Sequence, residues 1–219
     1  MKKITFLAIA GLLVVFACKK KESTTMVVKV PSFELIGPAA YSTVPGTGTY
    51  MDPGVNYYDE EGNTNILTTP TTSDVDLTSN GFYTASYEKK TEHGYNLKAN
   101  RLILVTPVPA SDDYSGVYTR VLVDGSFGTT VNITKVGTGL YKTDNVGGVA
   151  GNPNHIYDVY FGKLDNTSNL LVPTQVCPLD GSDISCNSAE INIVGADTII
   201  QWYIDNGNYN GAVLRKFVK

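Results

Sequence analysis

Histidine is scarce in this chain of 219 residues, and two common hydrolase motifs are absent. Two histidines occur, His93 and His155, and each lies beside residues that favour turns. The sequence contains neither the Gly-x-Ser-x-Gly elbow of serine hydrolases nor the His-Glu-x-x-His helix of zinc proteases. Because histidine is the usual general base near neutral pH, we interpret both as solvated loop residues. We therefore expect no catalytic residues and no enzymatic activity.

Several carboxylates lie in turn-forming segments, namely Asp52, Asp59, Glu60, Glu61, Asp180 and Asp183. Cleavage of a glycosidic bond needs two carboxyl groups held about 5–10 Å apart across a cleft, and adjacent glutamates on a turn do not provide this arrangement. None of these segments has the Asp-x-Asp-x-Asp-Gly pattern of a calcium-binding loop. We expect no bound metal.

Charge of either sign is low. The chain has 17 lysine and arginine residues against 21 aspartate and glutamate residues, a net charge of −4. No basic stripe occurs, so a nucleic-acid partner is not expected. With 42% hydrophobic and 17% charged residues, the composition also excludes a disordered chain. The one basic run, Lys19–Lys21, is interpreted as part of a tether that meets anionic lipid head groups.

Apolar stripes of helical length are absent after residue 17. Before that point, residues 4–17 form one apolar run behind Lys2 and Lys3. Fourteen residues of helix span about 21 Å, which is short of a hydrocarbon core about 30 Å thick. We therefore interpret residues 1–17 as a removable export signal and not as a membrane-spanning helix.

Cysteine is rare, with three residues, and the first ends the signal region. Cys18 closes the sequence Val-Phe-Ala-Cys, which resembles a bacterial lipobox. The resemblance implies a diacylglyceryl group on the Cys18 sulfur, cleavage before it and an N-acyl chain, which together anchor the protein in the outer membrane. The alternative is an ordinary signal cleaved near Ala17, which leaves an exposed thiol in an oxidising compartment. No other cofactor is expected.

The other two cysteines, Cys177 and Cys186, flank the polar segment Pro-Leu-Asp-Gly-Ser-Asp-Ile-Ser. A disulfide that closes this loop suits an exported domain. The alternative is a pair of metal-binding or redox thiols, but the spacing fits neither a Cys-x-x-Cys site nor a zinc knuckle. We predict a structural disulfide between them.

Hydrophobic residues after residue 30 recur with the period of two that is typical of β-strands. The clearest alternating positions are Val131 and Ile133, Tyr157, Val159 and Phe161, and Ile200, Trp202 and Ile204. Hairpin signals such as Asn80-Gly81 and Asp124-Gly125 separate these runs. The mature protein is therefore predicted to be all-β.

The segment Thr-Pro-Val-Pro-Ala-Ser-Asp-Asp at 106–113 is the strongest candidate for a domain boundary. Two prolines so close together are not expected in a central strand, and they stiffen a connection. Residues 18–30 are then a lipidated tether, 31–107 a first β-domain and 108–219 a second. The second has about eight strand-like runs, which suit an antiparallel sandwich or a small barrel.

The first domain resembles the bacterial surface-protein immunoglobulin-like family related to the HYR module. The family pattern is matched at Tyr50, Asp52, Pro53, Gly54, Val55, Asp59, Gly62, Val75, Asp76, Gly81, Tyr83, Tyr87 and Arg101. Residues 89–96 depart from it, because the family has Asp-x-x-Gly-Asn there. The resemblance implies an N-terminal Ig-like β-sandwich of seven strands without the disulfide of antibody domains.

The whole layout resembles small two-domain lipoproteins of Bacteroidota, in which such a module precedes a β-domain that opens with Ser-Gly-x-Tyr, here residues 115–118. Such proteins are often encoded beside SusC/SusD-like importers. The resemblance implies a cell-surface accessory in the capture of a glycan or peptide nutrient, with the first domain as a spacer. The alternative is a structural or adhesin-type lipoprotein that binds only protein partners. A periplasm-facing position is the alternative to the surface, because the tether has one early acid, Glu22.

Aromatic residues are the candidates for ligand contacts. Residues 201–211 place Trp202, Tyr203 and Tyr209 around an Asn/Gly loop. Trp202 shares a strand face with two isoleucines and is expected in the core, so Tyr203 and Tyr209 are the better candidates. Thr198 lies in an Asp-Thr-Ile triplet that resembles the O-glycosylation acceptor of this bacterial phylum, and modification requires that it face solvent.

Overall fold

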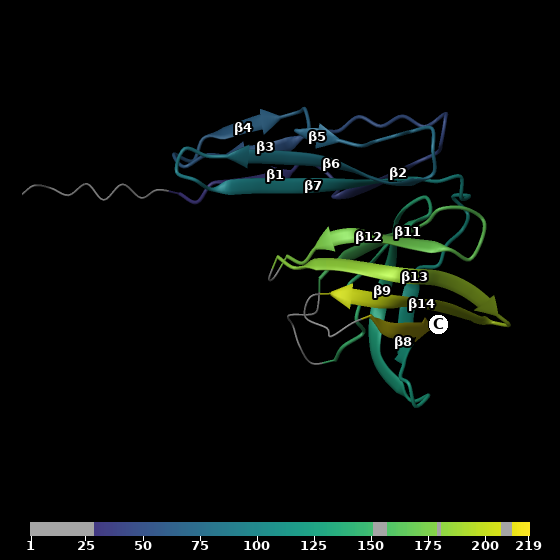
Figure 1. The fold of residues 1–219 in the computed structure, drawn as a ribbon. Helices are drawn as coiled ribbons and strands as arrows, with labels where there is room; N and C mark the ends of the chain where they lie inside the picture. Colours follow the sequence, from purple (N-terminus) through teal and green to yellow (C-terminus); the bar gives the residue numbers. More distant parts are fainter. Residues whose placement is uncertain (1–28, 151–156, 179–180, 207–211) are drawn as a thin grey trace, which may run out of the picture.

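The structure, a computed structural model, describes residues 29–150, 157–178, 181–206 and 212–219. Within these residues it has fifteen strands and no helix. No helix long and apolar enough to cross a membrane therefore occurs in the described ranges. The prediction of an all-β chain is confirmed. Figure 1 shows an N-terminal domain that lies along one side of a C-terminal barrel.

Seven strands form the two sheets of the N-terminal domain, in the orders β1-β3-β4 and β2-β7-β6-β5. The first pair in the second sheet is parallel, and the other neighbours are antiparallel. The strands are β1 (Ser32–Leu35), β2 (Ala40–Thr43), β3 (Val55–Tyr58), β4 (Thr64–Leu67), β5 (Thr72–Ser73), β6 (Gly81–Lys90) and β7 (Asn96–Val105). Figure 1 shows β3 and β4 stacked on β6 and β7. Membership of the immunoglobulin-like family stays a prediction.

The four-stranded sheet is covered on both of its faces. On β6, Ala85 and Tyr87 are buried in the core of the N-terminal domain, whereas Phe82 packs with Leu104 against the barrel. Strands that are buried on both faces read as continuous apolar runs. This explains why residues 102–105 at the end of β7 are all apolar and all buried.

A buried ion pair holds the segment between β2 and β3. The Arg101 guanidinium contacts the Asp52 carboxylate and donates to the Gly54 carbonyl at 3.2 Å. Asp52 also accepts hydrogen bonds from the hydroxyls of Tyr50 at 2.5 Å and Tyr87 at 2.8 Å. Burial alone raises the pKa of the Asp52 carboxyl, but these hydrogen bonds and the Arg101 charge lower it below its ordinary value. Five residues of the family pattern therefore build one buried polar network.

The remaining eight strands close into an antiparallel barrel in the order β10-β11-β12-β13-β14-β15-β8-β9. They are β8 (Gly116–Val121), β9 (Phe127–Gly137), β10 (Leu140–Thr143), β11 (Val159–Lys163), β12 (Leu170–Val176), β13 (Asp183–Val194), β14 (Asp197–Asn206) and β15 (Val213–Val218). Of the two predicted forms, the second domain is thus the barrel.

Aromatic side chains fill the interior of the barrel. Tyr141, Phe161, Trp202 and Phe217 form a chain in which neighbouring ring centroids are 5.2–5.6 Å apart. All four are almost completely buried. A barrel of eight strands is about wide enough for side chains to fill it, so this interior is a packed core and not a ligand cavity.

The predicted alternation is confirmed on β14. Ile200, Trp202 and Ile204 are at most 1% exposed, whereas Tyr203 between them is 42% exposed. The indole nitrogen of Trp202 donates a 3.0 Å hydrogen bond to the Val146 carbonyl, so its polar atom is satisfied inside the core. The expectation that Trp202 lies in the core is confirmed, and this burial contradicts the weaker prediction that it contacts a ligand.

The predicted disulfide is not formed, because Cys177 and Cys186 are free thiols buried in the barrel core. The Cys177 amide donates to the Ser182 carbonyl at 2.8 Å, so Cys177 lies opposite Ser182. Cys186, on β13, lies four residues after Ser182. Four strand residues cover about 13 Å, whereas a disulfide requires Cα atoms within about 7 Å. The hairpin register therefore separates two cysteines that a short loop had suggested were close.

Candidate functional site

A groove of about 380 Å³ lies between the two domains. One wall is formed by the barrel-facing side of β6 and β7, and the other by the outer face of β11 and β12. The N-terminal domain contributes Ala39, Thr84, Lys98, Asn100 and Leu102. The barrel contributes Asp158, Tyr160, Thr174, Gln175, Val176, Pro178 and Ile184.

The groove widens from a line where the two domains touch. Along the barrel-facing side of β7, Leu104 and Leu102 are buried, whereas Asn100 and Lys98 are exposed. The two leucines share an apolar cluster with Leu140 of the barrel. The walls therefore meet at Leu102 and diverge toward Lys98, so the groove has a closed end and an open end.

Gly162 permits the close approach of the domains at the closed end. A Cβ atom at this position would lie 2.6 Å from Leu104 Cδ2 and 2.9 Å from the Phe82 ring. Gly137 has a similar position, because a Cβ atom there would lie 2.4 Å from Ser42 Oγ. Side chains at these two glycines would collide with the N-terminal domain, so their absence sets how closely the walls approach.

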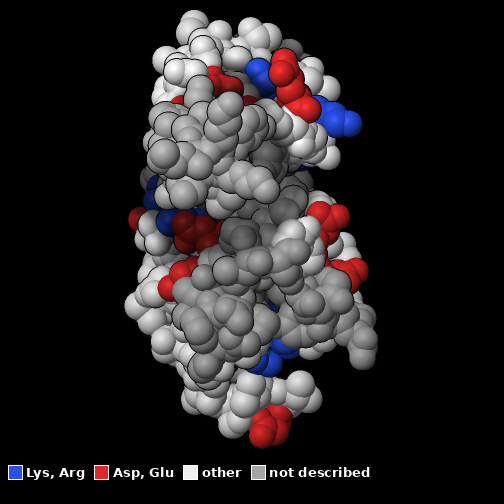
Figure 2. Space-filling view, turned by 90° about the vertical axis from the view of Figure 1, so that its left-hand side faces the viewer, with Lys and Arg blue, Asp and Glu red and all other residues white. Residues whose placement is uncertain are grey.

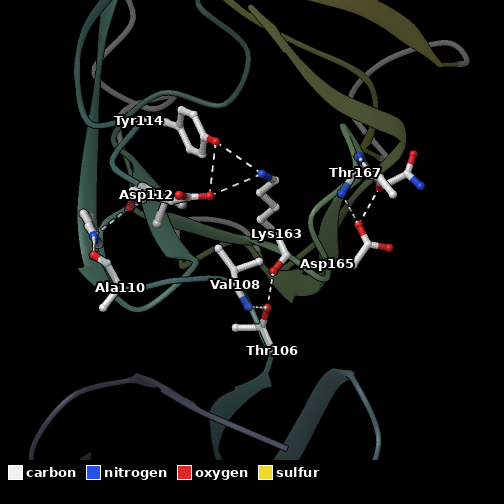
Figure 3. Close-up of polar contacts among 11 residues, drawn as sticks. Thr106, Val108, Ala110, Asp112, Tyr114, Lys163, Asp165 and Thr167 are labelled. Atoms are coloured by element: carbon white, nitrogen blue, oxygen red, sulfur yellow. Dashed lines mark hydrogen bonds and ion pairs between the residues drawn. The ribbon is translucent and has the colours of Figure 1, made fainter.

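The connection between the domains is held against the barrel by polar contacts (Figure 3). Thr106 Oγ1 donates a 2.7 Å hydrogen bond to the Lys163 carbonyl. The ammonium of Lys163 lies 3.2 Å from the Tyr114 hydroxyl and 3.5 Å from an Asp112 carboxylate oxygen. Lys163 and Thr106 are both buried. One lysine at the end of β11 thus holds the connection at both of its ends.

A second lysine, on β9, strengthens this attachment. Lys135 on β9 donates to the carbonyl oxygens of Ala110 at 2.6 Å and Asp112 at 2.7 Å. The Tyr141 hydroxyl donates to the same Asp112 carbonyl at 3.1 Å. The connection, which its two prolines predict to be stiff, is therefore bonded to the barrel through Thr106, Lys163 and Lys135. We call this set of contacts the clamp, and it fixes the walls of the groove relative to each other.

The charges near the groove are neutralised in pairs. Asp158 contacts Lys142 at 2.6 Å, and Lys98 contacts Glu88 at 2.9 Å. Burial raises the pKa of the Tyr160 phenol, and the Asp158 charge raises it further, so this hydroxyl is neutral at physiological pH. Figure 2 shows acidic and basic groups interspersed over the face that it presents. The groove therefore favours an uncharged ligand.

The ligand residues predicted from the sequence lie elsewhere. Tyr203 is on the outer face of β14 and does not line the groove. Tyr209 and Cys18 lie outside the described residues. Thr198 is half-buried at the start of β14, where its amide and carbonyl pair with Lys219. Of the predicted ligand residues that the structure describes, none reaches the groove, and glycosylation of Thr198 stays a prediction.

The predicted turn carboxylates support loops. Asp59 accepts a 2.7 Å hydrogen bond from the Asn63 amide, and Glu60 contacts His93 at 3.3 Å. His155 and Asp180 lie outside the described residues. Across the ranges that the structure describes, no group of three or more histidine, cysteine, aspartate or glutamate side chains is placed to hold a metal ion.

No pattern in the sequence predicts the groove, because its walls come from strands about sixty to ninety residues apart in the chain. One local signal is present. Pro173 interrupts the strand Leu170–Val176, and proline within a strand marks a bulge or an edge. The structure has such an irregularity between Val172 and Gln175, beside the groove.

By its fold, the protein is an all-β chain in which a domain of two sheets packs on a closed antiparallel barrel. No protein-family model and no curated protein matches the sequence. Among solved structures, the chain is similar to the lipoprotein BT2262 from Bacteroides thetaiotaomicron, with 18% identity and a TM-score of 0.41. That match covers 87% of this chain and 100% of the other. A likeness at this level assigns no role to any residue.

Proposed function

We propose that the chain is a non-enzymatic outer-membrane lipoprotein whose interdomain groove binds a short, uncharged segment of a glycan or peptide. The observation that carries this proposal is a preformed groove whose walls are fixed by the clamped connection. Fixed walls lower the entropy cost of binding, because no domain closure has to be ordered. In nutrient capture, the protein would serve as an accessory to an importer of the SusC/SusD-like type.

A lipid anchor at Cys18 would lie toward the open end of the groove. The Lys29 amide donates to the Glu60 carbonyl, and Glu60 contacts His93 in the turn before β7. The described chain therefore enters at the end of the molecule where β7 begins, which is the open end of the groove. Ten residues lie between Cys18 and Lys29, and the eleven steps from one to the other cover at most about 40 Å in an extended chain.

A second candidate function is that of an adhesin-type lipoprotein that binds only proteins. The turn between β8 and β9 favours it, because Val123 is 103% and Phe127 is 73% exposed. Apolar side chains at a protruding turn suit contact with a protein surface.

Two measurements test the proposed function. Labelling with radioactive palmitate should mark the wild-type protein and leave the Cys18→Ser variant unmarked. Capture of the native protein in mild detergent should recover an importer barrel and its lid lipoprotein if the accessory role is correct. If the captured protein is recovered without an importer and binds nothing on glycan and peptide arrays, the accessory role is contradicted and the adhesin is favoured.

A further inference from the structure

The barrel wall is incompletely paired where it borders the groove. β11 and β12 pair at Gly162 with Leu171 and at Lys163 with Leu170. Beyond these positions, Pro173 has no amide hydrogen to donate, and the pairing of β12 with β13 changes register. At the level of Tyr160, the main chain of β12 therefore does not continue the ladder.

A side chain takes the place of the missing strand at this level. The Gln175 carboxamide accepts a 2.8 Å hydrogen bond from the Tyr160 amide and donates a 2.8 Å hydrogen bond to the Tyr160 carbonyl. It also donates to the Pro173 carbonyl at 3.1 Å. In an antiparallel ladder, two residues exchange both N–H···O bonds in this way. The carboxamide carries the donor and the acceptor of a peptide group, so it imitates one residue of a neighbouring strand.

This pairing position opens into the groove. Tyr160 and Gln175 both line it, and so does Ile184, which belongs to the barrel core. The lining of the groove thus includes a residue that belongs to the interior of the barrel. A ligand in the groove therefore meets the Tyr160 main chain together with the side chain that occupies its hydrogen bonds.

We propose that the ligand of the groove is an extended peptide, which pairs with the main chain of Tyr160 after displacing the Gln175 carboxamide. The inference rests on the proposed function of the groove as a binding site and names its ligand class. An added strand is recognised through its main chain, which is uncharged and therefore suits a groove whose nearby charges are paired. A glycan of neutral hexoses presents hydroxyl groups and does not carry the amide and carbonyl that this position pairs.

The test compares peptides with sugars on the full-length chain in mild detergent. The probes are arrayed octapeptides with acetylated and amidated ends, and neutral hexasaccharides. The strongest peptide is then labelled for fluorescence anisotropy with wild type, Gln175→Ala and the control Gln201→Ala. Gln201 lies on β14 outside the groove, where its side chain bonds to Glu190.

Removal of the competing carboxamide should tighten peptide binding about tenfold in Gln175→Ala, whereas Gln201→Ala should bind as wild type does. N-methylation of the peptide residue that pairs with Tyr160 should weaken binding, whereas N-methylation of its two neighbours should not, because successive amides of a strand point to opposite sides. If Gln175→Ala does not fold, NMR of the wild-type chain gives the same answer. Peptide addition should then shift the Tyr160 amide and the Gln175 side-chain amide signals.

Each outcome separates this inference from the function on which it rests. Peptide binding that leaves the Tyr160 signal and the Gln175→Ala affinity unchanged would overturn the pairing but keep the groove as a binding site. If hexasaccharides bind and peptides do not, the pairing is also overturned, and the groove remains a binding site, for glycans. If neither class binds, both the inference and the proposed binding function fail.

Discussion

Thr106 Oγ1 donates a 2.7 Å hydrogen bond to the carbonyl of Lys163, and this contact joins the end of the N-terminal domain to the end of β11. The same lysine reaches Tyr114 and Asp112 with its ammonium group. A connection that is hydrogen-bonded in this way behaves as part of the barrel. The angle between the domains, and with it the width of the groove, is therefore a property of the folded state.

Replacement of Lys163 tests this clamp. In Lys163→Met the stem of the side chain is kept, while the charged hydrogen bonds to Tyr114 and Asp112 are lost. We expect a fall of about 1–2 kcal/mol in the free energy of unfolding and a broader distribution of distances between the domains. Spin labels at Asn65→Cys and Thr130→Cys report that distribution by pulsed electron resonance.

The control for this variant is Lys216→Met, which removes a lysine from the outer face of β15, away from the connection. It should leave the distance distribution as in wild type. An unchanged distribution in Lys163→Met would show that the apolar cluster alone fixes the domains.

A side chain at position 162 should force the domains apart. In Gly162→Leu the new atoms collide with Leu104 and Phe82, and overpacking of this kind costs about 1–3 kcal/mol. The same pair of spin labels should report a longer mean distance. Gly128→Leu is the matched control, because the nearest atoms to a Cβ there are 3.3–3.6 Å away. Equal distances in the two variants would contradict the role of Gly162.

The sequence predicts the parts of this fold that depend on local periodicity. The alternation around Trp202 identifies an inward strand face, and the two prolines after Thr106 identify the connection. The groove depends instead on long-range geometry. That Gly162 meets Leu104, and that Gln175 replaces a main-chain partner of Tyr160, follows from registers that no local pattern encodes. The immunoglobulin-like pattern marked Asp52 and Arg101 without showing that they form one buried pair.

The pair of Asp52 and Arg101 makes the stability of the N-terminal domain sensitive to acid. The pKa of Asp52 is lowered in the folded state. The ionised carboxylate therefore contributes fully to the free energy of unfolding above its pKa in the unfolded chain, about 3.9. This contribution is lost as the pH falls through the lower pKa of the folded chain. We expect Asp52→Asn to lose about 3 kcal/mol at pH 7, because Arg101 stays buried without its counter-charge.

Calorimetric unfolding between pH 2.5 and pH 7 measures this effect. The difference between wild type and Asp52→Asn should shrink as the pH falls below about 4, because the Asp52 carboxyl of the unfolded chain is protonated first and that of the folded chain follows at its lower pKa. Asp183→Asn makes the same change of charge at an exposed position on β13 and serves as the control. A pH-independent difference would show that the lost stability does not come from the charge of Asp52.

The two cysteines of the barrel should be unreactive in the folded protein and free after unfolding. Burial raises the pKa of the Cys186 thiol to about 12, so at pH 8 about one molecule in ten thousand carries the reactive thiolate. Cys177 is 3% exposed and is shielded by burial. Iodoacetamide should therefore modify neither residue in the native chain and both in 6 M guanidinium without a reductant, as mass spectrometry of the tryptic peptides would show. Modification of neither cysteine in guanidinium would reveal a disulfide, and the register of β12 and β13 would then be wrong at the turn.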